Sequence, residues 1–496
     1  MASAEQAAQG QTRQRRHGRQ QCAPGADPDP TPAATVALAR IPWSLWGQAL
    51  IIVLGAFTSM LSSTITNPAL PAMASGLHTT GGAVRWVAAG YLLALAAGVP
   101  LSGWAGRRLG VTRLWLGSLA LFCAFSVWCA LSGTIAMLIT GRVLQGLAGG
   151  LLVPAGQTIT GIVAGRERLG RIMSTIGIAI VVAPTLGTTL GGVMLGHLAW
   201  TWLFWLNVPL CAVAFAAGAA FLPRVPTGEA GRLDRLGLLL VIGGLPLLTY
   251  GVSAIGDAHG LGSVRADLCT AGGLLLLAAF AAWSLCATAP LLWLRLFTDR
   301  VFAASSAVMF FGGAVNFGAQ VVLPLYFTDV RHESLLAAGL LIGPQVIGTA
   351  LGFPLAGRLC DQYGSGTLLV AGGVITAVAT VPLALVGGGT GYAWLGAVLF
   401  VRGFGVALGT IPAMTAGLAA VRSDRMPDAA PLLNMLQRTG ASLGTTLVVV
   451  LYGAQPAGSA QAAEAFRHVS WWLFAGACLL ALPAVLLARA ERTATR

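Results

Sequence analysis

The sequence contains no lysine, and only 9% of its 496 residues are charged. Soluble globular domains carry about 25% charged residues, so this composition excludes that class. Hydrophobic residues make up 56% of the chain, and 66 residues are glycine, which is common where helices pack closely in a bilayer. The sequence therefore predicts an all-α polytopic membrane protein.

The sequence also lacks the patterns that mark metal, nucleotide and hydrolytic sites. Its eight cysteines show no CxxC spacing, and none of its six histidines lies in the middle of an apolar segment. No Gly-Lys phosphate-binding motif and no Ser/His/Asp group is visible. We expect no enzyme activity, no cofactor, no metal site and no direct use of ATP.

About fourteen apolar segments are long enough to cross a bilayer as helices. They follow residues 1–45, a polar stretch rich in Gln, Pro and Arg, which we expect to be a disordered cytoplasmic tail. The expected spans are 48–70, 84–105, 112–132, 134–157, 172–195, 200–222, 236–256, 267–292, 302–327, 335–358, 367–387, 392–419, 434–453 and 469–489.

The arginines predict the orientation of these spans. With the N-terminus in the cytoplasm, 22 of the 29 Arg fall on the cytoplasmic side, four fall outside and three lie within spans. Because cytoplasmic loops attract basic residues, both termini are expected in the cytoplasm of a multi-pass bacterial cell-membrane protein. This distribution also accounts for the net charge of +13 without a nucleic-acid partner.

The chain repeats itself at an offset of 254 residues. The Gly-Arg segment 103–110 follows the second span, and the similar segment 357–364 follows the tenth. We therefore expect two six-helix halves, residues 46–222 and 294–490, with two inserted helices in 223–293 and a short tail in 491–496. Two halves with a substrate path between them are typical of transporters.

Several motifs occur in order along these spans. They occupy residues 61–71, 86–92, 100–103, 103–110, 142–146, 172–192, 200–209 and 233–237. Together they resemble the major facilitator superfamily, and within it the fourteen-helix drug:proton antiporters of bacteria. The resemblance implies a proton-coupled exporter of antibiotics or other amphipathic molecules. It also implies that the fifth span is the bending helix typical of exporters, through Gly177, Pro184, Gly187, Gly191 and Gly192.

Two positions depart from the family pattern. Ser62 stands where the first helix usually carries Asp, and Gly106 stands where the first inner loop usually carries Asp. Only the second copy of that loop keeps its acid, Asp361. All 16 acidic residues are expected in tails, loops or helix ends, so no carboxylate is placed to carry a proton through the membrane.

Charged and amide residues near the repeated motifs are the gating candidates. Arg142 and Arg402 lie within spans and are expected to face the bundle interior, with Gln145 beside the first. Arg438 is expected to reach the inner surface from a helix end. The inner loops are expected to hold the inner face closed through Arg107, Arg108 and Arg358, with Asp361 as a carboxylate partner.

Two polar stripes are candidate linings of a substrate cavity. Thr58, Ser62 and Thr66 share one face of the first span. Asn316 and Gln320 share a face of the ninth span, and Gln345 lies in the tenth. Because the expected cavity carries Arg and no acid, a neutral or anionic small molecule is favoured over a cation.

Two other functions fit the same motifs. One is a metabolite carrier coupled to a different ion. The other is a membrane sensor that keeps the fold without transporting.

Overall fold

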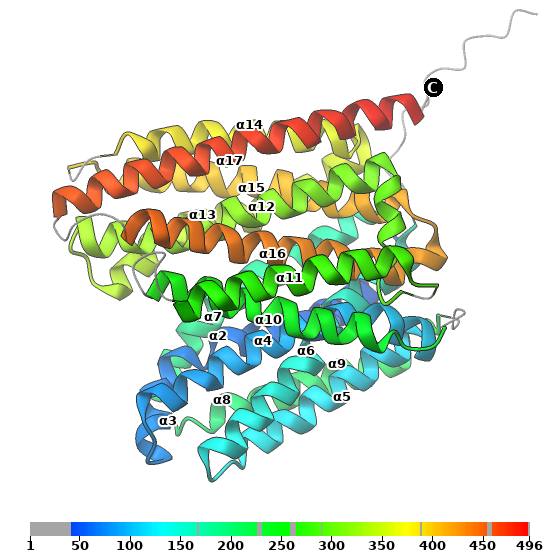
Figure 1. Cartoon of the computed structure of the whole chain (residues 1–496), viewed down its shortest axis with the longest axis horizontal. Coiled ribbons are helices and arrows are strands. Elements are labelled where there is room, and N and C mark those ends of the chain that lie inside the picture. The colour runs from blue at the N-terminus through cyan, green and yellow to red at the C-terminus, as the bar shows by residue number, and fades with distance from the viewer. Residues whose placement is uncertain are drawn as a thin grey trace, which may run out of the picture. The chain divides into compact units, whose positions relative to one another are not determined.

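The computed structural model describes residues 41–165, 168–225, 231–257, 264–288, 290–386, 389–453 and 459–494. Most of the expected N-terminal tail therefore lies outside the described residues. Within these ranges every regular element is a helix (Figure 1). Twelve of the described helices are long and apolar enough to cross a membrane. This confirms the expected all-helical membrane fold.

The first half begins with α2 and ends with α9. Its helices are α2 (Trp43–Thr64), η1 (Asn67–Ala69), α3 (Leu70–Gly76), α4 (Gly81–Leu109), α5 (Val111–Ala130), α6 (Ile135–Ala164), α7 (Leu169–Leu195), α8 (Trp202–Trp205) and α9 (Asn207–Phe221). Pro68 stands at the start of η1, where a missing backbone N–H is tolerated. The short helix η1 connects α2 to the short helix α3.

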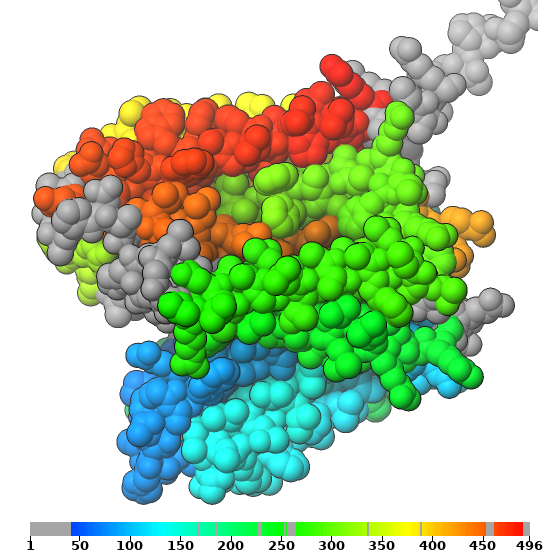
Figure 2. All heavy atoms as spheres, viewed as in Figure 1, coloured from blue at the N-terminus to red at the C-terminus, as the bar shows by residue number. Residues whose placement is uncertain are grey.

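The inserted pair and the second half follow. They comprise α10 (Arg235–Asp257), α11 (Val264–Cys286), η3 (Leu294–Thr298), α12 (Arg300–Leu325), η4 (Tyr326–Val330), α13 (Leu335–Tyr363), α14 (Ser365–Ala384), α15 (Tyr392–Ala420), η5 (Ser423–Arg425), α16 (Met426–Gly453) and α17 (Ser459–Ala494). The helix α10 packs against both α4 and α16. In Figure 2 the inserted pair, in green, lies between the blue and cyan first half and the orange and red second half.

The two halves show the same internal geometry at the repeated motif. Gly110 follows α4 with φ of 83°, and Gly364 follows α13 with φ of 82°. A side chain is strained in this left-handed region, which explains the glycine in both copies. Close helix packing also recurs: a Cβ at Gly98 would lie 2.6 Å from the carbonyl oxygen of Leu147, and one at Gly372 would lie 2.6 Å from the backbone nitrogen of Gly409.

Two expected helix starts are wrong, by eight and ten residues. The span expected at 434–453 is α16, which begins at Met426, and the span expected at 469–489 is α17, which begins at Ser459. The polar residues before position 434 favour a loop by hydropathy, but Pro427 fits the first turn of a helix. This correction changes the surroundings of every polar residue on α16.

Candidate functional site

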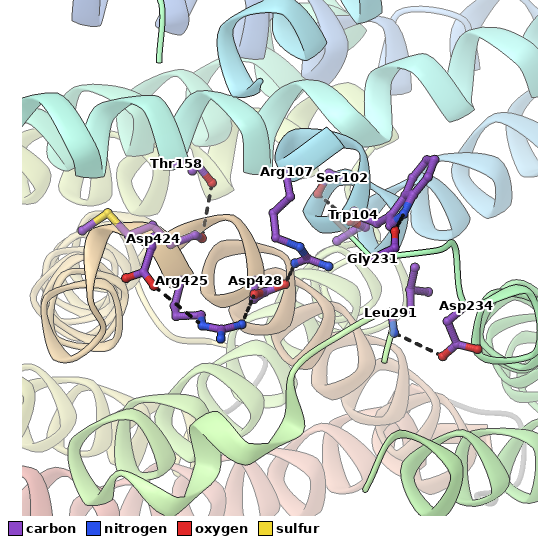
Figure 3. Close-up of polar contacts among 12 residues, drawn as sticks. Ser102, Trp104, Arg107, Thr158, Gly231, Asp234, Leu291, Asp424, Arg425 and Asp428 are labelled. Carbon is purple, nitrogen blue, oxygen red and sulfur yellow. Dashed lines mark hydrogen bonds and ion pairs between the residues drawn. The ribbon is translucent and has the colours of Figure 1, made fainter. Parts of the chain in front are cut away.

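An ion pair joins the two halves where α4 ends and α16 begins. Arg107, in the last turn of α4, pairs with Asp428, in the first turn of α16 (Figure 3). The Asp428 side chain is only 1% exposed, and Arg425 lies 3.9 Å from its second oxygen. Such a buried carboxylate is stable as an anion only with partners of this kind.

A second ion pair joins α7 to α13. The guanidinium Nε of Arg171 lies 2.7 Å from Oδ2 of Asp361, and the backbone N–H of Gly170 donates to Oδ1 at 3.0 Å. Asp361 belongs to the second copy of the Gly-Arg motif, as Arg107 belongs to the first. Each copy therefore reaches across to the opposite half.

Further hydrogen bonds join α6 to α16 near these ion pairs. Asn434 donates from Nδ2 to Oε1 of Gln157 at 2.5 Å, and Thr158 donates to the carbonyl of Met426 at 3.5 Å (Figure 3). We call this region the arginine-rich end: it is where α4 and α13 finish and α7 and α16 begin, and it carries Arg107, Arg108, Arg171, Arg358 and Arg425. These contacts hold the two halves together at that end.

Arg142 lies fully buried in the first third of α6 and uses all three nitrogens as donors. Nε donates to the carbonyl of Val87 at 3.1 Å, and Nη1 donates to Oγ of Ser62 at 3.0 Å and to Oε1 of Gln145 at 2.8 Å. Nη2 donates to the carbonyl of Ser62 at 3.1 Å and to Oγ1 of Thr66 at 3.5 Å. The guanidinium carbon lies 4.0 Å from the centre of the Tyr91 ring.

These contacts bring together four residues that the sequence singled out separately: Arg142, Gln145, Ser62 and Thr66. Gln145 is itself held by a bond of 2.6 Å from Nε2 to Oγ of Ser126. All the partners of the cation are neutral, because Ser62 occupies the position nearest to it on α2. The first half therefore contains a buried positive charge that is hydrogen-bonded but not neutralised.

Arg402 is the corresponding residue of α15, and it is much less well satisfied. It is 0% exposed, and Nη2 donates to the carbonyl of Val315 at 3.3 Å. Its Nε and Nη1 have no hydrogen-bond partner among the described residues. A small cavity of about 40 Å³ lies between α12, α14, α15 and α17, and Asn316 and Gln437 are among its lining residues.

The expectation for Arg438 is wrong. The sequence places it near a helix end, but it is the thirteenth residue of α16. At 1.5 Å per residue this puts it about 18 Å from the start of the helix, well inside the membrane span. The error follows from starting the helix eight residues too late, at position 434 instead of Met426.

The helix α7 contacts both halves. Toward its start, Gly177 faces Ile411 of α15 and Phe353 of α13. Toward its end, Gly187 and Gly191 allow close contact with α2, and the hydroxyl of Thr64 donates to the carbonyl of Pro184 at 2.9 Å. Gly192 has open space beside it.

The other expected site residues are less closely connected. Thr58 is buried and bonds the carbonyl of Leu54 in its own helix. Gln345 is buried with its Oε1 unpartnered among the described residues, and Gln320 is exposed. Arg108 and Arg358 are exposed at the arginine-rich end, so the partner of Asp361 is Arg171 and neither of these.

Three features of the interface are missing from the sequence-based expectations: Asp428, Arg171 and the central position of Arg438. The signal for the first was present. Pro427 followed by an acid is typical of a helix start, because proline needs no donor there and the acid favours the N-terminal dipole. A helix that starts at Met426 reveals both Asp428 and the depth of Arg438.

Known proteins are similar to this chain in sequence and in fold. The sequence profile of the Major Facilitator Superfamily matches residues 52–445. The chain is 32% identical over 416 residues to the multidrug resistance protein B homolog of Mycobacterium tuberculosis, covering 83% of this chain and 77% of that one. It is 29% identical over 465 residues to the putative multidrug resistance protein MdtD of Klebsiella pneumoniae, covering 91% and 95%.

A solved structure supports the fold. The crystal structure of the human organic anion transporter MFSD10 matches with a TM-score of 0.62 at 16% identity, covering 90% of this chain and 100% of that one. At this identity the likeness concerns the fold alone. The profile match and the paired halves lead to one conclusion: this chain is a multi-pass membrane transporter that belongs to the major facilitator superfamily.

Proposed function

We propose that this protein is a secondary active exporter of antibiotics or other amphipathic small molecules across the bacterial cell membrane, with both termini in the cytoplasm. Relatives that are named multidrug resistance proteins support this direction of transport. The arginine-rich end then faces the cytoplasm, as the distribution of basic residues favours.

The proposal is carried by two ion pairs that join the halves. Arg107 pairs with Asp428, and Arg171 pairs with Asp361. Ion pairs that join two rigid halves at one end can hold that end closed and release it when they break. The binding region between the halves is thereby opened to one side of the membrane at a time.

Proton coupling requires a group that can gain and lose a proton. Among the described residues no Asp or Glu lies in the middle of a spanning helix, so no carboxylate there is placed to carry a proton. The proposed proton acceptors are Asp361 and Asp428, because both are buried at the interface of the halves. Protonation would remove the charge that holds each ion pair together.

Export is tested by expressing the full chain in a bacterial host that lacks its main drug pumps. We expect lower accumulation of some antibiotics, and we expect a protonophore to restore accumulation. If accumulation of every compound stays unchanged while the protein is present in the membrane, a sensor function replaces the exporter. Efflux that the protonophore does not change would contradict proton coupling and favour a carrier coupled to another ion.

A further inference from the structure

One face of α16 is turned toward the first half. Pro427 contacts Gly103 of α4, and seven residues later Asn434 bonds Gln157 of α6. Arg438 is the next residue on this stripe, four positions beyond Asn434. The opposite face packs on α12, where Gly440 lies against Phe310 and Gly444 against Ala314. Arg438 therefore points toward the interface of the halves.

Two observations place Arg438 beside the Arg142 cluster. The helix α16 packs against α4, which carries Tyr91, and the charge of Arg438 acts on the Tyr91 hydroxyl. The ring of the same Tyr91 stacks on the guanidinium of Arg142 at 4.0 Å. One cation from each half therefore acts on the same tyrosine.

Unlike Arg142, Arg438 has no hydrogen bond or ion pair with any described residue. Its side chain is half-buried and therefore not fully enclosed by the helices around it. One turn further along α16, the buried hydroxyl of Ser442 also lacks a partner among the described residues. An unpaired charge at this depth is expensive unless another group neutralises it.

We propose that Arg438 binds the acidic group of the transported molecule, so that the substrates of this exporter are amphipathic organic anions such as carboxylates, sulfonates and ionised phenols. This inference rests on the exporter function proposed above. A guanidinium presents a planar fork of donors that matches a carboxylate or sulfonate. The apolar helices around it suit the remainder of an amphipathic molecule.

The test uses inside-out membrane vesicles that contain the full chain, with vesicles lacking it as background. The probes are fusidate and novobiocin as anions, chloramphenicol as a neutral molecule and ethidium as a cation. We expect uptake of the anions, with Arg438→Gln raising their half-saturating concentration roughly 10- to 100-fold, as loss of a charged hydrogen bond does. Arg438→Lys keeps the charge without the planar fork and is expected to restore only part of the affinity. Arg113→Gln removes an exposed arginine at the start of α5 and serves as the matched control.

A second measurement separates binding from folding. Because Arg438 is unpaired, Arg438→Gln should leave the unfolding temperature of the purified protein unchanged or higher, whereas loss of a structural arginine would lower it.

Three results count against the inference. Uptake of chloramphenicol or ethidium without uptake of either anion would overturn it and leave the exporter standing. Equal half-saturating concentrations for the wild type and Arg438→Gln would do the same. Failure to transport all four probes would overturn the exporter function, and the role of Arg438 with it.

Discussion

Arg142 and Arg438 show two ways in which a membrane protein holds a cation far from water. Arg142 donates to five oxygen atoms, and each donor atom of its guanidinium is used. Arg438 donates to none among the described residues. We therefore expect Arg142 to stabilise the fold and fix the positions of its neighbours, and Arg438 to bind a ligand.

We predict that Arg142→Gln strongly lowers the stability of the first half. The change leaves the buried Ser62 and Gln145 with unsatisfied acceptors, at a cost of about 1–3 kcal/mol for each acceptor. Thermal unfolding of the purified protein should show a lower midpoint for Arg142→Gln and an intermediate one for Arg142→Lys. An unchanged midpoint would mean that this network does not stabilise the fold.

The residues of this network could be recognised in the sequence because each belongs to a local motif. Arg142 and Gln145 are three residues apart, and Ser62 and Thr66 share a helical stripe. Their meeting could be anticipated only through the family resemblance, since 76 residues separate Arg142 from Thr66. Arg171 lacked such a motif, the helix-start signal at Pro427 and Asp428 did not reveal the partner of Asp428, and the partners of Asp428 and Arg171 lie 321 and 190 positions away in the chain.

At the scale of the helix, α7 owes its position to missing side chains. Gly191 lies against the backbone carbonyl of Ile65, which directly follows α2, whereas a methyl group added at the adjacent Gly192 would meet no atom within 4 Å. These neighbouring glycines therefore differ in whether a side chain can be added: Gly191 has no room for a methyl group, and Gly192 has room.

We predict opposite effects for alanine at these two glycines. Gly191→Ala forces α2 and α7 apart, at a cost of about 1–3 kcal/mol, and is expected to reduce both the unfolding temperature and export. Gly192→Ala is the matched control and should leave both unchanged, because its methyl group enters open space. Equal behaviour of the two variants would show that close packing of α7 on α2 is unimportant.

The existence and order of the long helices followed from apolar length alone, because lipid requires every backbone group to be bonded within the helix. The starts of α16 and α17 did not follow from apolar length. In α17 the helix extends beyond its apolar part through polar residues such as Glu464, Arg467 and His468. In α16 the polar residues are instead buried by the opposite half, which hydropathy cannot detect.

At the scale of the whole transporter, the two ion pairs are expected to control which side is open. We predict that Asp361→Asn and Asp428→Asn each weaken the closed arginine-rich end by about 3 kcal/mol, because a largely buried arginine, 13–14% exposed, loses its partner. Hydrogen exchange of the purified protein should then become faster at the end of α6 and the start of α16. The double variant should show the larger change.

Asp424→Asn is the control for these variants, since Asp424 is 60% exposed and pairs only with exposed arginines. Its exchange pattern should match that of the wild type. Faster exchange in this variant as well would assign the effect to general loosening of η5.

The proposed exchange of an organic anion, bound at Arg438 of α16, for an external proton has an electrical consequence. An anion that leaves while one proton enters moves two elementary charges in the direction that an inside-negative membrane potential favours. Each charge gains about 2.3 kcal/mol per 100 mV, so one such cycle gains about 4.6 kcal/mol per 100 mV. Such a pump remains powered by voltage in a cell whose pH gradient has collapsed.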